Sequence, residues 1–336
     1  MNILFSSYAF HPSIGGIESV SEILAEKFTA AGHEVTLITQ SVGDEGADNP
    51  FRIYRKPSTH ILRRLIGQCE IVFQNNISLR SLIPALLMRK PVLVVHQTWI
   101  QRPDGGVGWN DRLKRWLLPL VKNVAISAAV ARHLGRDTIV IGNPYRDEIY
   151  RLMPEVPRDR SLAFLGRLVS DKGVDLLLEA MKMLRAGGLK PDLTIIGTGP
   201  EEENLRRLSG ELGLKAQVTF AGYRFGDTLA RILNQHRVLV VPSLWAEPFG
   251  VVALEGIACG CVVVGSEEGG LKDAIGPCGF TFENGNAEAL AAALQGALFD
   301  LDVAESLRAC APNHLARFRA EAVATAYLEL MREMLR

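Results

Sequence analysis

The sequence predicts an α/β protein with two doubly wound parallel-sheet domains that face each other across a cleft. Short apolar runs alternate with amphipathic segments along the chain, which is typical of βαβ units. The alternation stops between Tyr145 and Arg160, a stretch with two prolines and many charges, and then starts again. A chain of 336 residues is also long for one core. We therefore expect domains over 1–150 and 151–315, and a helix over 316–336 that crosses back to the first domain.

The first half contains six apolar runs that we expect to form buried strands. They cover residues 3–5, 35–39, 71–73, 92–95, 124–126 and 139–141. Apolar side chains recur at helical spacing between them, most clearly over 17–31 and 81–89. This half therefore predicts one complete doubly wound unit.

The second half repeats the pattern. Strands are expected over 162–165, 193–196, 218–220, 238–241 and 262–264, and helices over 174–185, 201–212 and 317–335. Ligands of open α/β sheets bind at the carboxyl ends of the strands. We therefore expect the ligand in a cleft that faces the carboxyl ends of both sets of strands.

Composition and charge exclude several classes of protein. The chain is 48% hydrophobic and 22% charged, as in globular proteins, and its 37 Lys and Arg balance 37 Asp and Glu. No overall field therefore favours nucleic acid. Residues 1–150 carry 17 basic against 13 acidic side chains, a net charge of +4. That excess weakly indicates an anionic acceptor or membrane surface on this side.

The cysteines and the chain start predict a cytoplasmic protein. Five cysteines, with no CxxC spacing, indicate reduced and buried thiols. The first residues lack the basic and long apolar regions of a signal peptide, and 2–6 is expected to be a strand. No apolar run approaches the roughly eighteen residues that span a bilayer. Membrane contact is therefore expected to be peripheral, at the inner face.

The richest stretch is 238–274, where a buried strand is followed by a loop and a helix. The helix is expected to begin near Pro248, because proline suits the first helical position. The N–H groups of Phe249, Gly250 and Val251 would then point into the cleft as an anion or hydroxyl site.

Two carboxylates flank this helix start. Glu247 lies just outside it, and Glu255 follows eight residues later, about 9 Å along the helix from Phe249. One carboxylate would accept hydrogen bonds from sugar hydroxyls and the other from a ribose. The alternative is a helix N-terminal acid and a solvated surface glutamate.

The Glu247-x7-Glu255 pattern, in the setting AEPFG…LEGIACG, resembles the retaining glycosyltransferases of family 4, which have the GT-B fold. Other segments also resemble that family, in the same order along nearly the whole chain. They are SIGGIE (13–18), VIGNP (140–144) with Ser127 heading the preceding helix, FLGRLVSDKG (164–173), TIIGTGP (194–200) and VTFAG (218–222).

The resemblance implies a donor site built around two basic residues. Arg167, after Gly166, and Lys172 would hold the diphosphate of the leaving nucleotide, arginine as a planar fork and lysine as a point charge. The alternative is a surface arginine and a lysine at a helix N-terminus, where the dipole disfavours a cation. Gly222 and Tyr223 would lie at the nucleobase pocket.

Glycines and one histidine complete the predicted site. Gly15 and Gly16 precede a helix, so that backbone approaches phosphate closely, although such a pair is more often only a turn. Gly197 begins a Gly-x-Gly pair that lacks a third glycine. His96 ends a buried strand and, by resemblance, would contact the donor sugar; a lone histidine is otherwise structural.

The resemblance implies a retaining hexosyltransferase that needs no metal or cofactor, since Arg167, Lys172 and helix dipoles neutralise the diphosphate. Catalysis is assigned to His96, Glu247, Arg167 and Lys172, with Glu247 as a positioning and electrostatic group. The donor would be a UDP-sugar, favoured over a GDP-sugar. The acceptor would be a saccharide or lipid-linked saccharide, in cell-surface polysaccharide or glycoconjugate synthesis. Asp300-Leu-Asp302 is expected to be a helix cap and solvated turn.

The sequence leaves two alternative functions open, and it departs from the family pattern in two places. The chain could be a non-catalytic nucleotide-binding subunit of the same fold or a sugar-nucleotide epimerase, whereas the lysine-bound cofactor segment of a phosphorylase is missing. Asp273 stands where glutamate is commoner, and the first domain is compact.

The segment 109–120, in the half expected to bind the acceptor, has the pattern of an amphipathic helix. Residues 109–120 place Trp109, Trp116 and other apolar side chains on one helical face, with Arg112, Lys114 and Arg115 off it. This pattern suits an anionic membrane surface. Packing of that face against the first sheet is the favoured alternative. A basic cluster supports the membrane hypothesis; it comprises Arg52, Arg55, Lys56, Arg63 and Arg64.

Overall fold

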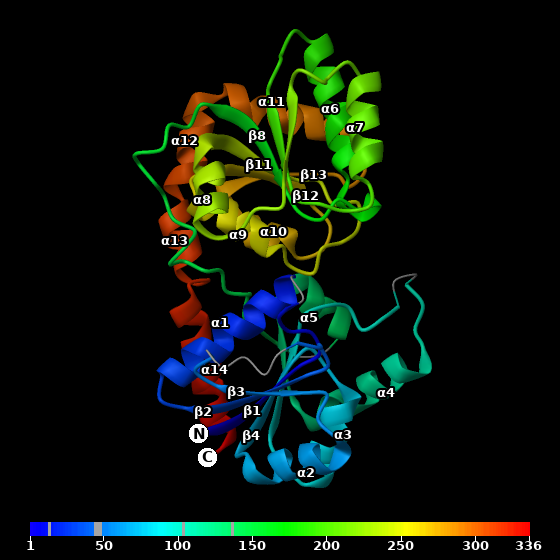
Figure 1. Ribbon diagram of the computed structural model, residues 1–336, viewed down its shortest axis with the longest axis vertical. Helices are drawn as coiled ribbons and strands as arrows, with labels where there is room; N and C mark the ends of the chain where they lie inside the picture. Colours follow the sequence, from blue (N-terminus) through cyan, green and yellow to red (C-terminus); the bar gives the residue numbers. More distant parts are fainter. Residues whose placement is uncertain (13–14, 44–48, 103–104, 136–137) are drawn as a thin grey trace. The chain divides into compact units, whose positions relative to one another are not determined.

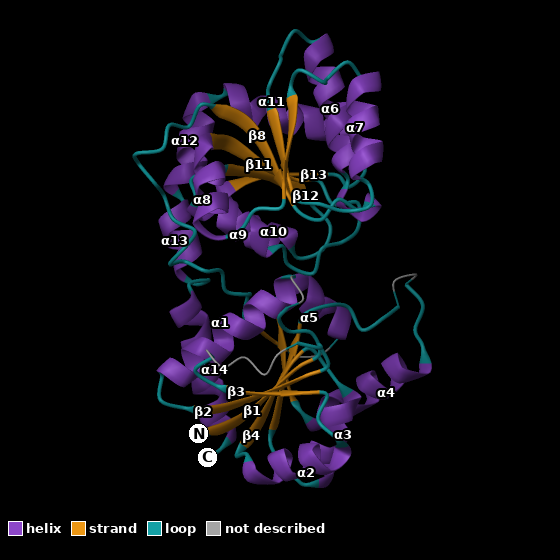
Figure 2. Ribbon diagram, in the orientation of Figure 1, coloured by secondary structure: helices purple, strands orange, loops and turns teal. Residues whose placement is uncertain are grey.

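The computed structural model describes residues 1–12, 15–43, 49–102, 105–135 and 138–336, and the glycine motif at 13–18 therefore lies partly outside the described residues. The chain divides into two compact units (Figure 1). Unit 1 is Met1–Pro144 with Arg319–Arg336, and unit 2 is Tyr145–Phe318. Each unit contains a parallel sheet flanked by helices (Figure 2). The fold class predicted from the sequence, two parallel α/β units, is confirmed; the domain limits 1–150, 151–315 and 316–336 stay predictions.

Unit 1 has a seven-stranded sheet in the order β3-β2-β1-β4-β5-β6-β7, and its described pairings are parallel. The strands are β1 (Asn2–Ser7), β2 (Glu34–Thr39), β3 (Arg52–Arg55), β4 (Ile71–Asn75), β5 (Val92–His96), β6 (Lys122–Ala125) and β7 (Ile139–Val140). The chain reverses its winding direction between β1 and β4. In doubly wound sheets, ligands bind at the carboxyl ends of the strands at such a switch point.

The helices of unit 1 include one from the far end of the chain. They are α1 (Gly16–Ala30), α2 (Thr59–Gln68), α3 (Leu79–Leu87), α4 (Trp109–Leu117), α5 (Ala128–Leu134) and α14 (Ala320–Met334), with a 3-10 turn η1 (Leu118–Leu120). Helices α1 and α14 pack together. Phe73 of β4 contacts Phe28 of α1 and Tyr327 of α14, with ring centroids 5.4 and 5.3 Å apart. The last helix therefore completes the core of unit 1.

Unit 2 repeats the topology with six strands in the order β10-β9-β8-β11-β12-β13. They are β8 (Arg160–Leu165), β9 (Leu193–Ile196), β10 (Val218–Gly222), β11 (His236–Val241), β12 (Val262–Ser266) and β13 (Gly279–Phe282). The reversal here falls between β8 and β11, which are paired in parallel. Unit 2 therefore has its switch point where the loops after β8 and β11 meet.

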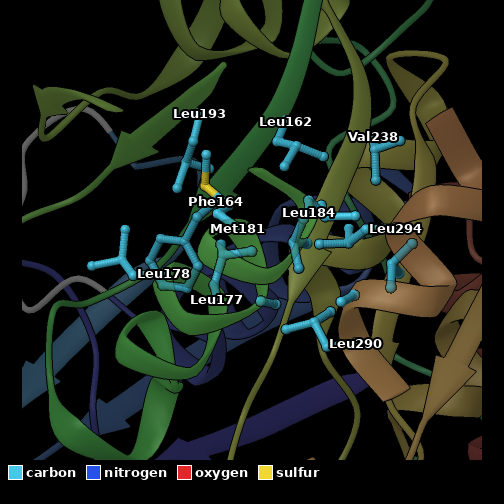
Figure 3. Packing of buried hydrophobic residues seen from close by; sticks show 14 of the residues in the cluster. Leu162, Phe164, Leu177, Leu178, Met181, Leu184, Leu193, Val238, Leu290 and Leu294 are labelled. Atoms are coloured by element: carbon cyan, nitrogen blue, oxygen red, sulfur yellow. The ribbon is translucent and has the colours of Figure 1, made fainter. Parts of the chain in front are cut away.

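The helices of unit 2 cover its sheet. They are η2 (Ser170–Lys172), α6 (Val174–Ala186), α7 (Glu202–Glu211), α8 (Gly226–Gln235), α9 (Val251–Ala258), α10 (Leu271–Ile275), η3 (Gly276–Cys278), α11 (Ala287–Phe299), α12 (Leu301–Ala309) and α13 (Ala311–Ala316). Figure 3 shows part of the core, in which α6 and α11 pack side chains against the central strands. In α6 the apolar residues recur every three or four positions, so Leu177, Met181 and Leu184 share the buried face.

The structure corrects the sequence analysis at several elements. Strands β3 and β13 are additional, and α9 begins at Val251 rather than near Pro248. Four cysteines are free and buried as predicted, whereas Cys310 is half-buried. Asp300 does cap a helix, since its Oδ1 accepts a hydrogen bond of 3.1 Å from the N–H of Val303 in α12.

The favoured packing of the 109–120 helix is wrong. Within α4, Leu117 is buried, but Trp109 and Trp116 are 78% and 72% exposed, and Leu120 beyond the helix is 59% exposed. Most of the apolar face predicted to cover the sheet therefore lies open to solvent.

Candidate functional site

The switch point of unit 2 brings two predicted residues into contact. Lys172 ends η2 in the loop after β8, and Glu247 lies in the loop after β11. The Lys172 Nζ donates a short hydrogen bond to Glu247 Oε1, and the side chains are only 20% and 13% exposed. Because β8 and β11 are neighbours, their carboxyl-end loops bring together residues 75 positions apart in the chain. The result is a partly buried ion pair at the place where α/β sheets bind ligands.

Glu247 is fixed by its backbone as well as its side chain. Its carbonyl accepts a hydrogen bond of 2.7 Å from the N–H of Gly270, and the residue forms a parallel bridge with Gly269. A Cβ on Gly269 would lie 2.3 Å from the Glu247 carbonyl oxygen, and φ there is +84°. Only glycine fits this approach. The loop after β12 therefore holds Glu247 in place.

Ser243 is a residue of this site that the sequence analysis missed. Its Oγ donates to Glu247 Oε1 at 2.8 Å, and its own carbonyl accepts from Ser266 Oγ at 2.7 Å. Both donors to Glu247 use Oε1, so Oε2 has no hydrogen-bond donor in the described part of the chain. A hydroxyl residue two positions after a buried strand and four before Glu247 was a signal that could have identified it.

Arg167 also lies after β8, and its side chain is exposed. No hydrogen bond or ion pair engages its guanidinium among the described residues, so it is available to an anion. The neighbouring Gly166 meets Gly197: a Cβ on Gly197 would lie 1.9 Å from the Gly166 carbonyl oxygen. The close approach of the loops after β8 and β9 therefore explains glycine at position 197, whereas a Cβ on Gly166 would meet only the Phe164 side chain, at 3.2 Å.

The start of α9 differs from its predicted geometry. Gly250, with φ of +92°, is the N-cap and Val251 the first helical residue. Phe249 precedes the helix; its side chain is buried, and its ring lies 5.6 Å from that of Phe318. The N–H groups without an intrahelical acceptor therefore begin at Val251, and the Phe249 side chain is a core residue.

Glu255 lies on α9 in a different environment from Glu247. It is half-buried, and burial raises its pKa to about 7. Burial and then the Glu255 carboxylate raise the pKa of Tyr150, a buried residue in the segment expected to be a linker. Tyr223 acts on the same Tyr150 hydroxyl and stacks against Phe225 at 5.8 Å, just after Gly222 ends β10. Glu255 and Tyr223 are therefore both close enough to the Tyr150 hydroxyl to raise its pKa.

Unit 1 holds a buried polar network at its own switch point. Asn75, at the end of β4, donates to Ser21 of α1 at 2.7 Å and accepts from Gln97 at 2.8 Å. Gln97 and Asn143 exchange hydrogen bonds of 2.8 and 2.9 Å. Gly15 and Gly16 open α1 beside this network, and a Cβ on Gly16 would meet nothing within 4 Å. Only Gly16 therefore lies at an open position, because a Cβ on Gly15 would lie 2.6 Å from Glu18 Oε2.

His96 ends β5, as predicted, and is fully buried. Its Nε2 lies 2.9 Å from Asn123 Oδ1, and the Asn123 amide nitrogen donates to two backbone carbonyls, which fixes that oxygen toward the ring. Burial lowers the pKa of His96 to about 4. The ring is therefore neutral near pH 7 with its proton on Nε2 and an unpartnered Nδ1 acceptor among the described residues.

No group of three or more His, Cys, Asp or Glu side chains within the described ranges is arranged to hold a metal ion. None of the described helices is both long and apolar enough to cross a bilayer.

Two parallel α/β units, with basic and acidic side chains meeting at a switch point, define a GT-B glycosyltransferase fold. The chain belongs to the family Glycosyl transferases group 1, also called GT4, whose model matches residues 134–314. The resemblance stated from the sequence is thereby confirmed.

Curated relatives support the same family. An uncharacterized glycosyltransferase of Methanocaldococcus jannaschii is 41% identical over 118 residues, 35% of this chain and 30% of that protein. A D-inositol 3-phosphate glycosyltransferase of Rhodococcus opacus is 34% identical over 185 residues, 52% of this chain and 41% of that protein. The chain thus matches less than half the length of these relatives.

Solved structures match over almost the whole chain. Anabaena HepE in complex with UDP has a TM-score of 0.84 at 19% identity, covering 99% of this chain and 100% of that one. A glycosyltransferase from Rickettsia africae also has a TM-score of 0.84 at 19% identity, covering 100% and 99%. At such identities the likeness shows the fold.

Proposed function

We propose that this protein is a retaining, metal-independent hexosyltransferase that moves a sugar from a nucleotide diphosphate sugar to a saccharide or lipid-linked saccharide. The observation that carries the proposal is the contact of Lys172 and Ser243 with one oxygen of Glu247 at the switch point of unit 2. This arrangement offers a cation to a phosphate and a carboxylate oxygen to a sugar hydroxyl at one place.

Departure of the nucleotide needs stabilisation of a developing diphosphate charge. Lys172 and the exposed Arg167 lie in one loop after β8 and supply two positive groups without a metal ion. Lys172 would leave Glu247 for the phosphate when the donor binds. The positive end of α9 adds a helix dipole.

Glu247 is proposed to position the sugar rather than to attack it. Its Oε2 is available to sugar hydroxyls while Ser243 holds Oε1. The acceptor hydroxyl would attack from the side on which the nucleotide departs, and the leaving phosphate would take its proton, which retains the configuration. His96 is proposed, from the family resemblance, to contact the donor sugar; its Nδ1 is buried and unpartnered among the described residues.

Glu255 and Tyr223 are proposed to contact the ribose and base. We favour UDP over GDP as the nucleotide, because HepE, of the same fold, binds UDP together with glucose. The basic excess of the first half supports an anionic or membrane-borne acceptor, and a relative named for inositol phosphate supports one rich in hydroxyls. Cell-surface polysaccharide or glycoconjugate synthesis, at the cytoplasmic face of the membrane, would use such an acceptor.

The test combines nucleotide binding with nucleotide release. Thermal shifts with UDP, GDP, ADP and their sugars should single out one base, since ligand at about one hundred times its Kd stabilises the folded state by about 2.7 kcal/mol. The matching sugar nucleotide should then release its nucleotide, faster with a saccharide acceptor. Lys172→Met should lower the rate constant of release by about 10²-fold or more. The matched control, Lys182→Met on the exposed face of α6, should leave it unchanged.

Each rival has its own outcome in the same assay. A binding subunit would shift thermally without releasing nucleotide from any donor. An epimerase would convert the sugar while the nucleotide stays attached. Activity that disappears in EDTA and returns with magnesium would contradict the metal-independent mechanism.

A further inference from the structure

Helix α4 presents large apolar side chains that the fold of unit 1 leaves uncovered. Trp109 and Trp116 are seven residues apart, which places them on one helical face, and they are 78% and 72% exposed. Leu120 follows at 59% exposure. We call Trp109, Arg112, Trp116 and Leu120 the α4 surface. Exposed aromatic residues gathered on one face mark an interaction site more often than single exposed residues do.

The opposite side of α4 is tied to unit 1, so the exposed face has a fixed direction. Leu117 is buried, and the Arg115 guanidinium donates to the carbonyl of Ile100 at 3.1 Å and contacts His133 at 2.8 Å. Asp111 accepts from the N–H of Gly108 at 3.0 Å and pairs with Lys114 at 3.8 Å. Arg115 and the buried Leu117 therefore anchor the helix to unit 1, the Asp111 contacts cap its first turn, and its tryptophans are exposed.

The charge around the α4 surface is basic. Three of the five Lys and Arg in residues 101–123 are exposed, namely Arg102, Arg112 and Lys122. Arg112 lies between the two tryptophans and is exposed, as is Lys122. The Arg102 guanidinium lies against Gly108, since a Cβ there would be 2.9 Å from its Nε. A partner for this surface therefore combines an apolar layer with negative charge.

We propose that the α4 surface is a peripheral membrane-binding site that inserts into the interface of an anionic bilayer. Tryptophan prefers the membrane–water interface, where its ring meets acyl chains and its N–H meets water. Arg112 and its basic neighbours contact lipid phosphates. A protein partner with an acidic rim is disfavoured, because the surface is a convex helix face rather than a groove.

Membrane binding would bring the protein to a lipid-linked acceptor, and only this benefit rests on the proposed function. The binding itself depends on unit 1, whereas the donor site lies in unit 2. Flotation and nucleotide binding can therefore fail independently, and each failure identifies which proposal is wrong.

The test is flotation of the full chain with vesicles of phosphatidylcholine alone or mixed with phosphatidylglycerol. We expect the protein to float with the mixed vesicles, to remain below those of phosphatidylcholine, and to be released by salt. Trp109→Ser with Trp116→Ser should abolish flotation, and Arg112→Glu should weaken apparent affinity at least about tenfold. Since all three side chains are exposed, the variants should keep the wild-type melting temperature.

A matched control removes apolar surface elsewhere. Phe299→Ser with Leu301→Ser changes two side chains of unit 2 that are 52% and 65% exposed, and should float like the wild type. The proposal is overturned if the tryptophan variant floats like the wild type, or if the wild type ignores anionic vesicles. It is equally overturned if the wild type is a dimer that the tryptophan variant converts to a monomer while vesicles have no effect.

Discussion

At the scale of single residues, two carboxylates of unit 2 differ because their surroundings differ. Glu247 receives hydrogen bonds from Lys172 and Ser243 at one carboxylate oxygen. Glu255 has no such donor among the described residues, and burial raises its pKa to about 7. The Glu255 carboxyl is therefore on the border of neutrality near pH 7 until a ligand supplies hydroxyl donors.

The raised pKa of Glu255 makes the free energy of unfolding depend on pH. Its pKa is about 7 in the folded protein against 4.5 as the ordinary value, so the folded state retains a proton that the unfolded state releases between these values. The contribution to stability is complete below about pH 4.5 and is lost as the pH rises through about 7. Glu255→Gln should therefore raise the unfolding free energy of the ligand-free protein at about pH 8 by on the order of 2 kcal/mol.

Urea unfolding at about pH 5 and about pH 8 checks this prediction, with Glu179→Gln on the exposed face of α6 as control. The gain with Glu255→Gln should be large at the higher pH and several times smaller at the lower one. Equal gains at both values, or the same effect in the control, would show that the charge of Glu255 is not the cause.

At the scale of elements, the site depends on loops that touch through backbone. The bridge between Gly269 and Glu247 joins the loop after β12 to the loop after β11. Gly269→Ala should displace Glu247, because the new methyl group would meet its carbonyl oxygen 2.3 Å away. We expect transfer to fall by about 10²-fold, the usual effect of misplacing a catalytic group by about an ångström.

Gly285→Ala is the matched comparison. Gly285 also has a positive φ, +74°, but nothing lies within 4 Å of the added Cβ. Both variants should lose about 1 kcal/mol of stability from backbone strain, whereas only Gly269→Ala should lose activity. If Gly269→Ala released nucleotide as fast as the wild type, the loop after β12 would not be needed to position Glu247.

Elements were predictable where burial was complete. Strands such as β5 and β12 are buried on both faces, so their sequences are continuous apolar runs. The two missed strands lie at sheet edges: β3 has arginine at both ends, and β13 begins with glycine. Each of the two has only one buried residue, Ile53 in β3 and Phe282 in β13, so its apolar pattern is weaker. The packing of the 109–120 helix was predicted wrongly, because periodicity identifies an apolar face but gives no information on which element covers it.

At the scale of the whole molecule, the C-terminal helix α14 belongs to unit 1, together with the first 144 residues. Tyr327 of α14 is 1% exposed and contacts Phe73 of β4 edge-on. Tyr327→Ala should therefore destabilise unit 1 by about 3 to 5 kcal/mol, as for other large aromatic residues removed from a core. The melting of unit 2 should change much less, because its core is separate.

Tyr327→Phe separates ring from hydroxyl. The Tyr327 hydroxyl is buried with no hydrogen-bond partner in the described part of the chain. Removing it should be neutral or stabilising, because an unpartnered buried hydroxyl costs free energy. Calorimetry of the full chain measures both variants; a large loss of stability with Tyr327→Phe would reveal a partner for this hydroxyl.

The sequence by itself determined the fold class, the positions of most buried strands along the chain and the family, because these depend on local patterns of burial and on motifs contiguous in the chain. It also named both partners of the Lys172–Glu247 contact. Only the tertiary structure showed that they touch, that Ser243 shares Glu247 Oε1, that the Glu255 carboxylate raises the pKa of Tyr150, and that the tryptophans of α4 are exposed. Contacts across neighbouring strands join residues far apart in the chain, and no periodicity within a single segment records them.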